Sequence, residues 1–371
     1  MKALFIVRPD WNFVSGGDVI QVQETSSILN DQFLVETDIV STLWNIDLAK
    51  YDLVHFFHLP AINVDDFNAV KRYGIPIVVS PIFWDTTELW FEDAVVQKPV
   101  WRGMDSILGR KASRKLYLNW QASKLRRSSS WKTNRRILQQ SDLLLPNSKT
   151  EMKHLTDYFK LCGCETLDKA KVIHNGVNKE FFRDLESLRE KGHAFEAKHG
   201  VNQFVLEVAR IEKAKGQASL IKSLMETDHL LVIIGNPSPY ESDYVKSVQN
   251  LSRQRGNTVV ISGLPQEELI GAYVSAKVHV LPSWRETPGL VSLEAAAAGC
   301  KIVSTELGSA KDYFGAFATY CDPRDPNSIR SAIEQSAAKQ TAPDALRNLI
   351  LTKFTWEVAA RETYSAYQGL L

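Results

Sequence analysis

Short apolar runs rich in β-branched residues recur along the chain, separated by loops rich in glycine, proline and polar residues. Runs of this length and composition predict buried β-strands. In the first half of the chain they cover residues 3–7, 52–57, 75–80, 142–146 and 171–176, and in the second half 204–208, 230–234, 258–261, 278–281 and 301–304.

Helical patterns of polar and apolar positions alternate with these strands. They cover residues 19–29, a segment that begins near Lys149, residues 185–199, a segment that begins at Leu290, and the C-terminal residues 354–371. Such alternation is typical of an α/β fold built on parallel sheets. Because 371 residues are many for a single core, we expect two domains.

Composition and charge narrow the function classes. The formal net charge is only +1, so the chain as a whole is not basic enough to predict sequence-independent binding of nucleic acids. Cys162 and Cys164 lack a second pair or a nearby histidine at ligand spacing, which predicts reduced thiols and no zinc site. The first apolar stretch is too short for a signal peptide and no run approaches the length of a membrane span. We therefore expect a cytoplasmic protein that at most lies against a membrane.

Residues 276–299, AKVHVLPSWRETPGLVSLEAAAAG, pass from a predicted strand through a loop into a predicted helix. Gly289 stands where that helix should begin, so the N–H groups of Leu290 and Val291 are open to an anion such as a phosphate. Glu286 and Glu294 flank this start, and ionised carboxylates suit paired hydroxyls. A nucleotide sugar has this layout, with a diphosphate between a ribose and a hexose.

At these residues the chain resembles a known family. LPSWRETPGLVSLEAAAAGCKIVSTELGS, residues 281–309, resembles the donor-site motif of the retaining glycosyltransferases of family four, in which two glutamates are separated by seven residues. The resemblance implies the GT-B fold, an α/β fold of two doubly wound, Rossmann-like domains facing across a cleft. VIHNGVNKEFF resembles the segment that closes the first domain, which places the domains at residues 1–180 and 181–355 and a returning C-terminal helix at 356–371.

The resemblance also implies roles for residues of the second half. ARIEKAKG, residues 209–216, resembles the family's Arg and Lys motif, so that Arg210 and Lys215 would offset the negative charge on the departing nucleoside diphosphate. Glu286 would hold the donor sugar and Glu294 the ribose. The remaining donor contacts would come from the helix start at Gly289, Leu290 and Val291 and from the nucleobase loop at Gly263 and Leu264.

The first half offers candidates after its strands, where open α/β sheets bind ligands. Gly16 and Gly17 lie between a strand and a helix, and the resemblance implies that they face the donor phosphate and the acceptor. Arg8 is a further candidate, with a salt-bridged strand end as the alternative. Related enzymes often carry a histidine just beyond the strand at 75–80, where this chain has none, and Asp85 is the titratable catalytic candidate there.

Residues 84–140 differ from the rest in carrying many lysines, arginines and aromatic residues. One interpretation is a solvated helical insertion whose aromatic side chains pack on the core. The other is a basic and aromatic surface that contacts anionic lipid headgroups or a lipid pyrophosphate acceptor. Both remain open at this point.

Together these features predict a retaining hexosyltransferase that uses a UDP- or GDP-linked sugar and needs no metal or other cofactor. By resemblance, the leaving phosphate would help to remove the acceptor proton, and the acceptor would attack from the same face. The expected acceptor is a glycan or lipid-linked glycan, as in bacterial surface polysaccharide or O-antigen assembly. The alternative is a GT-B protein that transfers no sugar, such as a nucleotide-sugar epimerase or a sugar-nucleotide binding protein.

Overall fold

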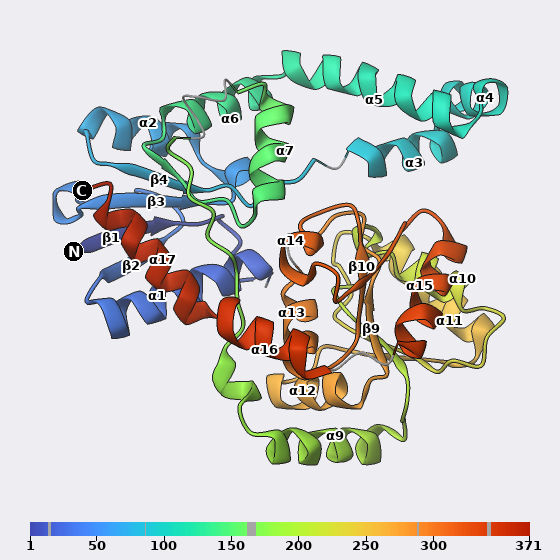
Figure 1. Cartoon of the computed structure of the whole chain (residues 1–371). Helices are drawn as coiled ribbons and strands as arrows, with labels where there is room; N and C mark the ends of the chain where they lie inside the picture. The colour runs from blue at the N-terminus through green and yellow to red at the C-terminus, as the bar shows by residue number, and fades with distance from the viewer. Residues whose placement is uncertain (14–15, 86, 162–167, 288, 340–342) are drawn as a thin grey trace. The chain divides into compact units, whose positions relative to one another are not determined.

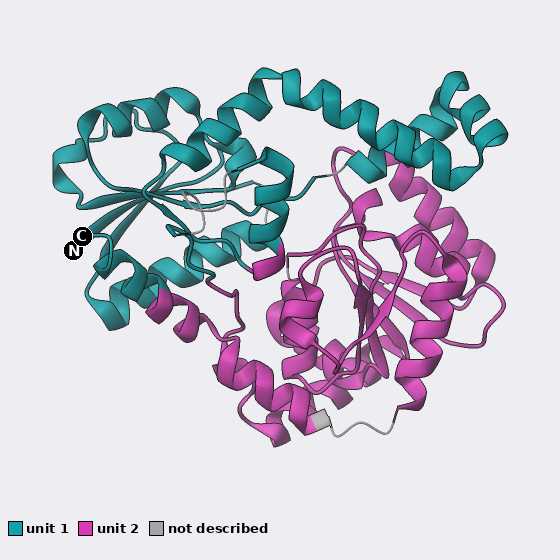
Figure 2. Ribbon diagram, turned by 45° about the horizontal axis from the view of Figure 1, so that its top comes forward, with its two compact units in different colours: residues 1–147, 151–172, 363–371 teal, residues 148–150, 173–362 magenta. Residues whose placement is uncertain are grey.

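Two parallel sheets, each in its own unit, organise the chain (Figure 2). The structure is a computed structural model that describes residues 1–13, 16–85, 87–161, 168–287, 289–339 and 343–371. Unit 1 comprises residues 1–147, 151–172 and 363–371, and unit 2 comprises residues 148–150 and 173–362. The predicted α/β fold with two parallel-sheet domains is confirmed.

In unit 1 the strands pair in the order β2-β1-β3-β4-β5 (Figure 1). Their bounds are β1 Lys2–Ile6, β2 Glu36–Val40, β3 Leu53–Phe57, β4 Ile77–Ser80 and β5 Leu143–Leu144. The helices of this part of the chain are α1 Gly17–Phe33, α2 Val64–Tyr73, α3 Thr87–Gln97, α4 Pro99–Leu108, α5 Arg110–Arg127, α6 Ser129–Gln140 and α7 Lys149–Phe159. β3 and β4 are buried throughout, as expected of central strands covered on both faces.

In unit 2 the strands pair in the order β11-β10-β9-β6-β7-β8. Their bounds are β6 Val205–Val208, β7 Leu231–Ile234, β8 Thr258–Ile261, β9 Val278–Leu281, β10 Ile302–Thr305 and β11 Thr319–Cys321. The helices are α9 Leu185–His199, α10 Gln217–Ser223, α11 Ser242–Arg255, α12 Gln266–Ser275, α13 Leu290–Ala297, α14 Ala310–Phe314, α15 Pro326–Ala338 and α16 Pro343–Lys353.

The C-terminal helix α17, Trp356–Gln368, begins in unit 2 and ends in unit 1. Its Tyr367 is buried in unit 1, where the hydroxyl lies 2.6 Å from His55 Nδ1. The other ring nitrogen of His55 lies 2.9 Å from Ser80 Oγ, and burial lowers the pKa of His55 to about 3. His55 therefore serves as an internal, neutral hydrogen-bonding group that ties the end of α17 to β3 and β4.

The predicted strand at residues 171–176 is wrong. Its neighbours Ala170 and Val177 make single bridges, to Leu144 and Thr355, but no ladder joins them. The amide of Asn175 donates to the Tyr313 hydroxyl at 3.1 Å and that of Val177 to the carbonyl of Phe354 at 2.9 Å. Because the amides of Lys171, Asn175 and Val177 donate to three different neighbours, residues 171–176 form no strand ladder with either sheet.

Candidate functional site

The strand order of unit 2 reverses direction between β6 and β9. From β6 the chain proceeds to β7 and β8 on one side and then returns to β9, β10 and β11 on the other. All pairs are parallel, so the loops after the adjacent strands β6 and β9 emerge side by side at the carboxyl edge. Ligands of doubly wound sheets bind at this reversal point. The loop after β6 carries Arg210 and Lys215, and the loop after β9 carries Glu286.

Lys215 and Glu286 form an ion pair across these two loops. Lys215 Nζ lies 2.8 Å from Glu286 Oε1, and the Glu286 side chain is 6% exposed. Burial opposes the charge on Lys215, but the nearby Glu286 carboxylate outweighs it and raises the pKa of Lys215. The structure therefore brings together two residues that the sequence placed in the donor site 71 positions apart.

Gly289 caps α13, the helix predicted to begin there. Its φ of 80° lies in the left-handed region, which favours glycine. A Cβ at this position would lie 3.3 Å from Glu286 Oε2 and 3.0 Å from Leu281 Cδ2. The Glu286 carboxylate thus lies beside the positive end of the helix, where the first N–H groups have no acceptor within the helix. Leu290 and Val291 begin the helix and pack against the core cluster of unit 2.

Two close backbone approaches fix the loop that carries Glu286. The Ser309 amide donates to the carbonyl of Glu286 at 2.8 Å, and a Cβ on Gly308 would lie 2.4 Å from that same oxygen. On the other side the Trp284 amide donates to the carbonyl of Ala214 at 2.8 Å. The carboxylate therefore projects from a backbone held by neighbouring loops.

Glu294 lies one turn into α13 and has defined partners. The buried Tyr273 hydroxyl donates to Glu294 Oε2 at 3.0 Å, and Gln266 Nε2 lies 3.5 Å from Oε1. Burial, with the Glu294 carboxylate beside it, raises the pKa of Tyr273 well above its usual range. Tyr273 is therefore a neutral donor that orients the Glu294 carboxylate, and the sequence did not single it out.

Arg210 and the Gly263–Leu264 loop complete the set in unit 2. Arg210 Nη1 lies 3.7 Å from Glu212 Oε2, and the side chain of Arg210 is 32% exposed. Gly263 donates its amide to Asn236 Oδ1 at 2.9 Å, and Leu264 packs against the core. Asn236 follows β7 as Gly263 follows β8, so these loops belong to the same carboxyl edge of the sheet.

Glu207 was not among the site residues predicted from the sequence. It lies in β6, is fully buried, and neither of its carboxylate oxygens has a hydrogen-bond partner among the described residues. Burial and the Glu286 carboxylate raise the pKa of Glu207 well above its ordinary value, with Lys215 acting in the opposite direction. The available signal was a single acidic residue in an otherwise apolar strand, VLEV.

His279 is a second buried group that the sequence did not single out. It lies in β9, with its Nε2 3.1 Å from the Ser292 hydroxyl of α13. Burial lowers the pKa of His279 to about 3, so the ring is neutral. This contact joins the first turn of α13 to the central strand beside it.

Unit 1 also has a polar cluster at its strand reversal, which lies between β1 and β3. Arg8 Nε lies 2.5 Å from Asp18 Oδ2 and Arg8 Nη1 2.6 Å from Asp10 Oδ1. His58 Nδ1 lies 3.6 Å from the same Asp18 oxygen. Burial acts to raise the pKa of Asp18, but the contacts with His58 and Arg8 outweigh this effect and lower it. Arg8 therefore forms the ion pairs expected if its role is to hold a salt-bridged strand end.

Gly16 and Gly17 lie at the start of α1 beside this cluster. Gly16 is the N-cap residue, and its carbonyl accepts from the amide of Val19 at 3.1 Å. Gly17 is the first helical residue and is exposed, whereas residues 14–15 lie outside the described part of the chain. Asp85, in contrast, has a structural contact, because its carboxylate accepts from the Thr87 amide at 2.7 Å at the start of α3.

The predicted residues therefore fall into two groups within separate units. Lys215, Glu286 and Gly289 lie in contact in unit 2, with Arg210 and Glu294 on the same loop and helix, whereas Arg8, Gly16, Gly17 and Asp85 belong to unit 1. Among the residues that the structure describes, no group of three or more His, Cys, Asp or Glu could hold a metal ion.

Curated proteins similar to this chain include proteins named as glycosyltransferases and a glycogen synthase. The D-inositol 3-phosphate glycosyltransferase of Corynebacterium jeikeium is 27% identical over 260 residues, which cover 63% of this chain and 59% of the relative. Glycogen synthase of Mycobacterium tuberculosis is 27% identical over 242 residues, which cover 62% of this chain and 55% of the relative. The chain thus spans less than two thirds of the length of these relatives.

Solved structures share the whole fold. Sucrose-phosphate synthase from Thermosynechococcus elongatus gives a TM-score of 0.75 at 17% identity, covering 100% of this chain and 98% of that chain. HepE of Anabaena in complex with UDP gives a TM-score of 0.70 at 16% identity, with 100% of each chain covered. Residues 189–349 match the family model described as glycosyl transferases group 1. This chain therefore has the GT-B fold of glycosyltransferases, and residues 189–349 of its second unit are similar to the glycosyl transferases group 1 family.

Proposed function

We propose that this chain transfers a hexose from a nucleotide sugar to a glycan or lipid-linked glycan, with retention of the anomeric configuration. The observation that carries the proposal is the contact of Lys215 with Glu286 beside the glycine that begins α13. It joins a cation, a carboxylate and a helix N-terminus at the strand reversal of a doubly wound sheet. A sugar diphosphate needs these three kinds of group.

The donor would bind with its diphosphate at the N–H groups of Leu290 and Val291. Arg210 and Lys215 would then offset the negative charge that develops on the departing nucleoside diphosphate. Glu286 would accept hydrogen bonds from the donor hexose, and Glu294, oriented by Tyr273, from the ribose. The solved relatives support this class of donor, since HepE was crystallised with UDP and with UDP-glucose. The donor of this chain would be a UDP- or GDP-linked hexose.

Unit 1 would supply the acceptor side of the reaction. Gly16 and Gly17 begin α1 beside the cluster of Arg8 and Asp18, which offers both charges to a sugar or phosphate. Asp85 remains the proposed acid or base near the acceptor, although its carboxylate is also bonded to Thr87. In a retaining reaction the leaving phosphate itself would help to remove the acceptor proton. We place the reaction in the cytoplasm, in the assembly of a surface polysaccharide such as an O-antigen.

The test is release of nucleoside diphosphate from a panel of UDP- and GDP-hexoses, with and without candidate acceptors. Transfer predicts release that rises with acceptor and a glycoside whose anomeric proton coupling in NMR matches that of the donor. Lys222→Ala, an exposed cation on α10, is the matched control for Lys215→Ala. Binding without release, conversion of the free nucleotide sugar, or an inverted product would contradict the proposal.

A further inference from the structure

Helices α3, α4 and α5 of unit 1 pack on one another (Figure 1), and exposed aliphatic side chains lie at the two ends of α4 and at the end of α3. Ile107 is 83% exposed, Val96 68%, Val100 67% and Leu108 51%. Single exposed apolar residues are ordinary on a protein surface, but a group of large ones marks a site of contact. We call these four residues, together with the exposed cations Lys98, Arg102 and Lys111, the insertion tip.

The aromatic residues of this segment are mostly not part of that surface. Trp101 and Tyr117 are buried, in a small core that they form with Phe91 and Ala94. These rings are buried, as the first interpretation of residues 84–140 expects, but they pack within the insertion and not on the main core of unit 1. Trp90 and Trp120 are exceptions, since they are 40% and 45% exposed, and Lys124 Nζ lies 5.5 Å from the Trp120 ring centroid.

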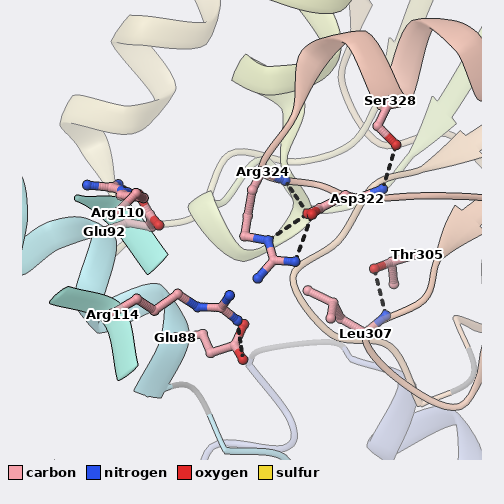
Figure 3. Close-up of polar contacts among 9 residues, drawn as sticks. All are labelled: Glu88, Glu92, Arg110, Arg114, Thr305, Leu307, Asp322, Arg324 and Ser328. Carbon is pink, nitrogen blue, oxygen red and sulfur yellow. Dashed lines mark hydrogen bonds and ion pairs between the residues drawn. The ribbon is translucent and has the colours of Figure 1, made fainter. Parts of the chain in front are cut away.

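In residues 87–140 the negative charges are half-buried and the exposed charges are positive. The acidic residues of the insertion are all half-buried, and arginines pair with several of them. Glu88 pairs with Arg114 at 2.7 Å (Figure 3), and Asp105, at 2.8 Å, and Glu92 both pair with Arg110. Every exposed charged residue between positions 87 and 140, all of which the structure describes, is a lysine or arginine. The outer surface is therefore positive, although the whole chain carries a formal charge of only +1.

The cations at the tip are held next to the aliphatic side chains. Arg102 donates to the carbonyl of Val96 and, at 3.5 Å, to that of Val95, so its guanidinium stays at the end of α3. Lys98 lies between Val96 and Val100 in the sequence, and Lys111 lies in the first turn of α5, just beyond Gly109, which separates it from Ile107 and Leu108 at the end of α4. Apolar side chains flanked by cations match the boundary between lipid headgroups and acyl chains.

We propose that the insertion tip docks on an anionic lipid bilayer, with the four aliphatic side chains among the upper acyl chains and the cations at the headgroups. Charge complementarity selects anionic lipid, and the exposed aliphatic residues favour a bilayer over nucleic acid, whose backbone offers them no apolar contact. In the described part of the chain no helix is long and apolar enough to span a bilayer, and the docking proposed is peripheral. The proposal does not rest on glycosyl transfer.

The test is co-sedimentation of the full chain with vesicles of phosphatidylcholine containing about one-third phosphatidylglycerol, compared with phosphatidylcholine alone. We expect binding to the anionic vesicles that weakens as salt is added. Val100→Ser with Ile107→Ser, and separately Lys98→Glu with Lys111→Glu, should each lower the bound-to-free ratio by about tenfold or more. The control is Leu185→Ser with Lys222→Glu, an exposed pair in unit 2, which should bind like the parent.

Circular dichroism and an unchanged thermal midpoint would establish that the variants fold. Equal binding to neutral vesicles, or parental binding by both tip variants, would overturn the proposal. So would a labelled oligonucleotide whose affinity falls in the tip variants while vesicle binding does not change. Nucleoside diphosphate release with a water-soluble acceptor should stay parental in the tip variants, so that loss of docking is distinguished from loss of transfer.

Discussion

The Lys215 ammonium contacts the Glu286 carboxylate at 2.8 Å while Glu286 also lies beside the glycine that begins α13. The two side chains therefore neutralise each other at the position proposed for the donor. A bound diphosphate would compete with Glu286 for Lys215, and a hexose hydroxyl would compete with Lys215 for Glu286. Substitutions in the two loops should consequently separate structural from catalytic contributions.

Arg210→Ala and Lys215→Ala should differ in their effect on stability. Both should lower the rate of transfer by about a hundredfold, the loss typical of one group that stabilises developing charge. Lys215→Ala should also lower the free energy of unfolding by about 1–3 kcal/mol, because it leaves the Glu286 carboxylate buried without its cation. Arg210, 3.7 Å from Glu212 and partly exposed, should give a near-parental thermal midpoint. Steady-state kinetics and thermal unfolding check both, and parental turnover in either variant would refute the assignment.

Glu294→Ala should weaken binding of the donor nucleotide by about tenfold or more, because it removes an ionised hydrogen-bond acceptor. Tyr273→Phe should have a smaller effect in the same direction, since it removes the hydroxyl that orients Glu294 at 3.0 Å. Calorimetric titration with UDP and GDP gives both dissociation constants. An unchanged constant for Glu294→Ala would remove this residue from the donor site.

Gly289→Ala should lower both stability and donor affinity. An alanine there must adopt a φ of 80°, which costs about 1–2 kcal/mol, and its Cβ would meet Leu281 and the Glu286 carboxylate. Gly256→Ala is the matched control, because Gly256 has a φ of 77° and open space around its Cβ position. Both variants should lose stability, and Gly289→Ala alone should lose donor affinity. Equal donor affinity in the two variants would contradict a diphosphate site at α13.

Glu207 should make stability depend on pH. Its pKa is raised in the folded protein above the usual 4.5, so the folded state binds more protons than the unfolded state at pH values between these two pKa values. The stability of the parent should therefore fall, relative to that of Glu207→Gln, as pH rises above 4.5 toward the folded-state pKa. Thermal midpoints across pH 4 to 8 measure this, with exposed Glu190→Gln as control. A constant difference between parent and Glu207→Gln across this range would show that Glu207 is ionised in the fold.

The fold was predictable where strands are buried on both faces, because a short, mostly apolar run rich in β-branched residues indicates a buried strand in an α/β chain. β3, β4, β6 and β9 were predicted for this reason. β2 was not, since ETDIV is largely polar and forms the half-buried edge of its sheet. The apolar residues Val172 and Ile173 suggested a strand, but the amides around them bond to separate neighbours.

Individual residues of the candidate site could be predicted from the sequence, but the contacts between residues far apart in the chain could not. The spacing of Glu286 and Glu294 around Gly289 identified the helix start, because those residues are close in sequence. The contact of Lys215 with Glu286 depends on the adjacency of β6 and β9, which spacing along the chain does not contain. Tyr273, which bonds to Glu294 from another helix, depends likewise on tertiary packing.

Gly216 lies so close to Pro282 that a Cβ would stand 2.4 Å from the carbonyl oxygen of that proline. The loop after β6 and the loop after β9 are therefore in close backbone contact, and the conformation of each depends on the other. An engineer who wished to graft the donor preference of a relative onto this scaffold would have to transplant residues 209–216 and 282–289 together. In a chimera that received only one of the two loops, the backbones at positions 216 and 282 would clash, and the loop would misfold whatever sugar it was meant to bind.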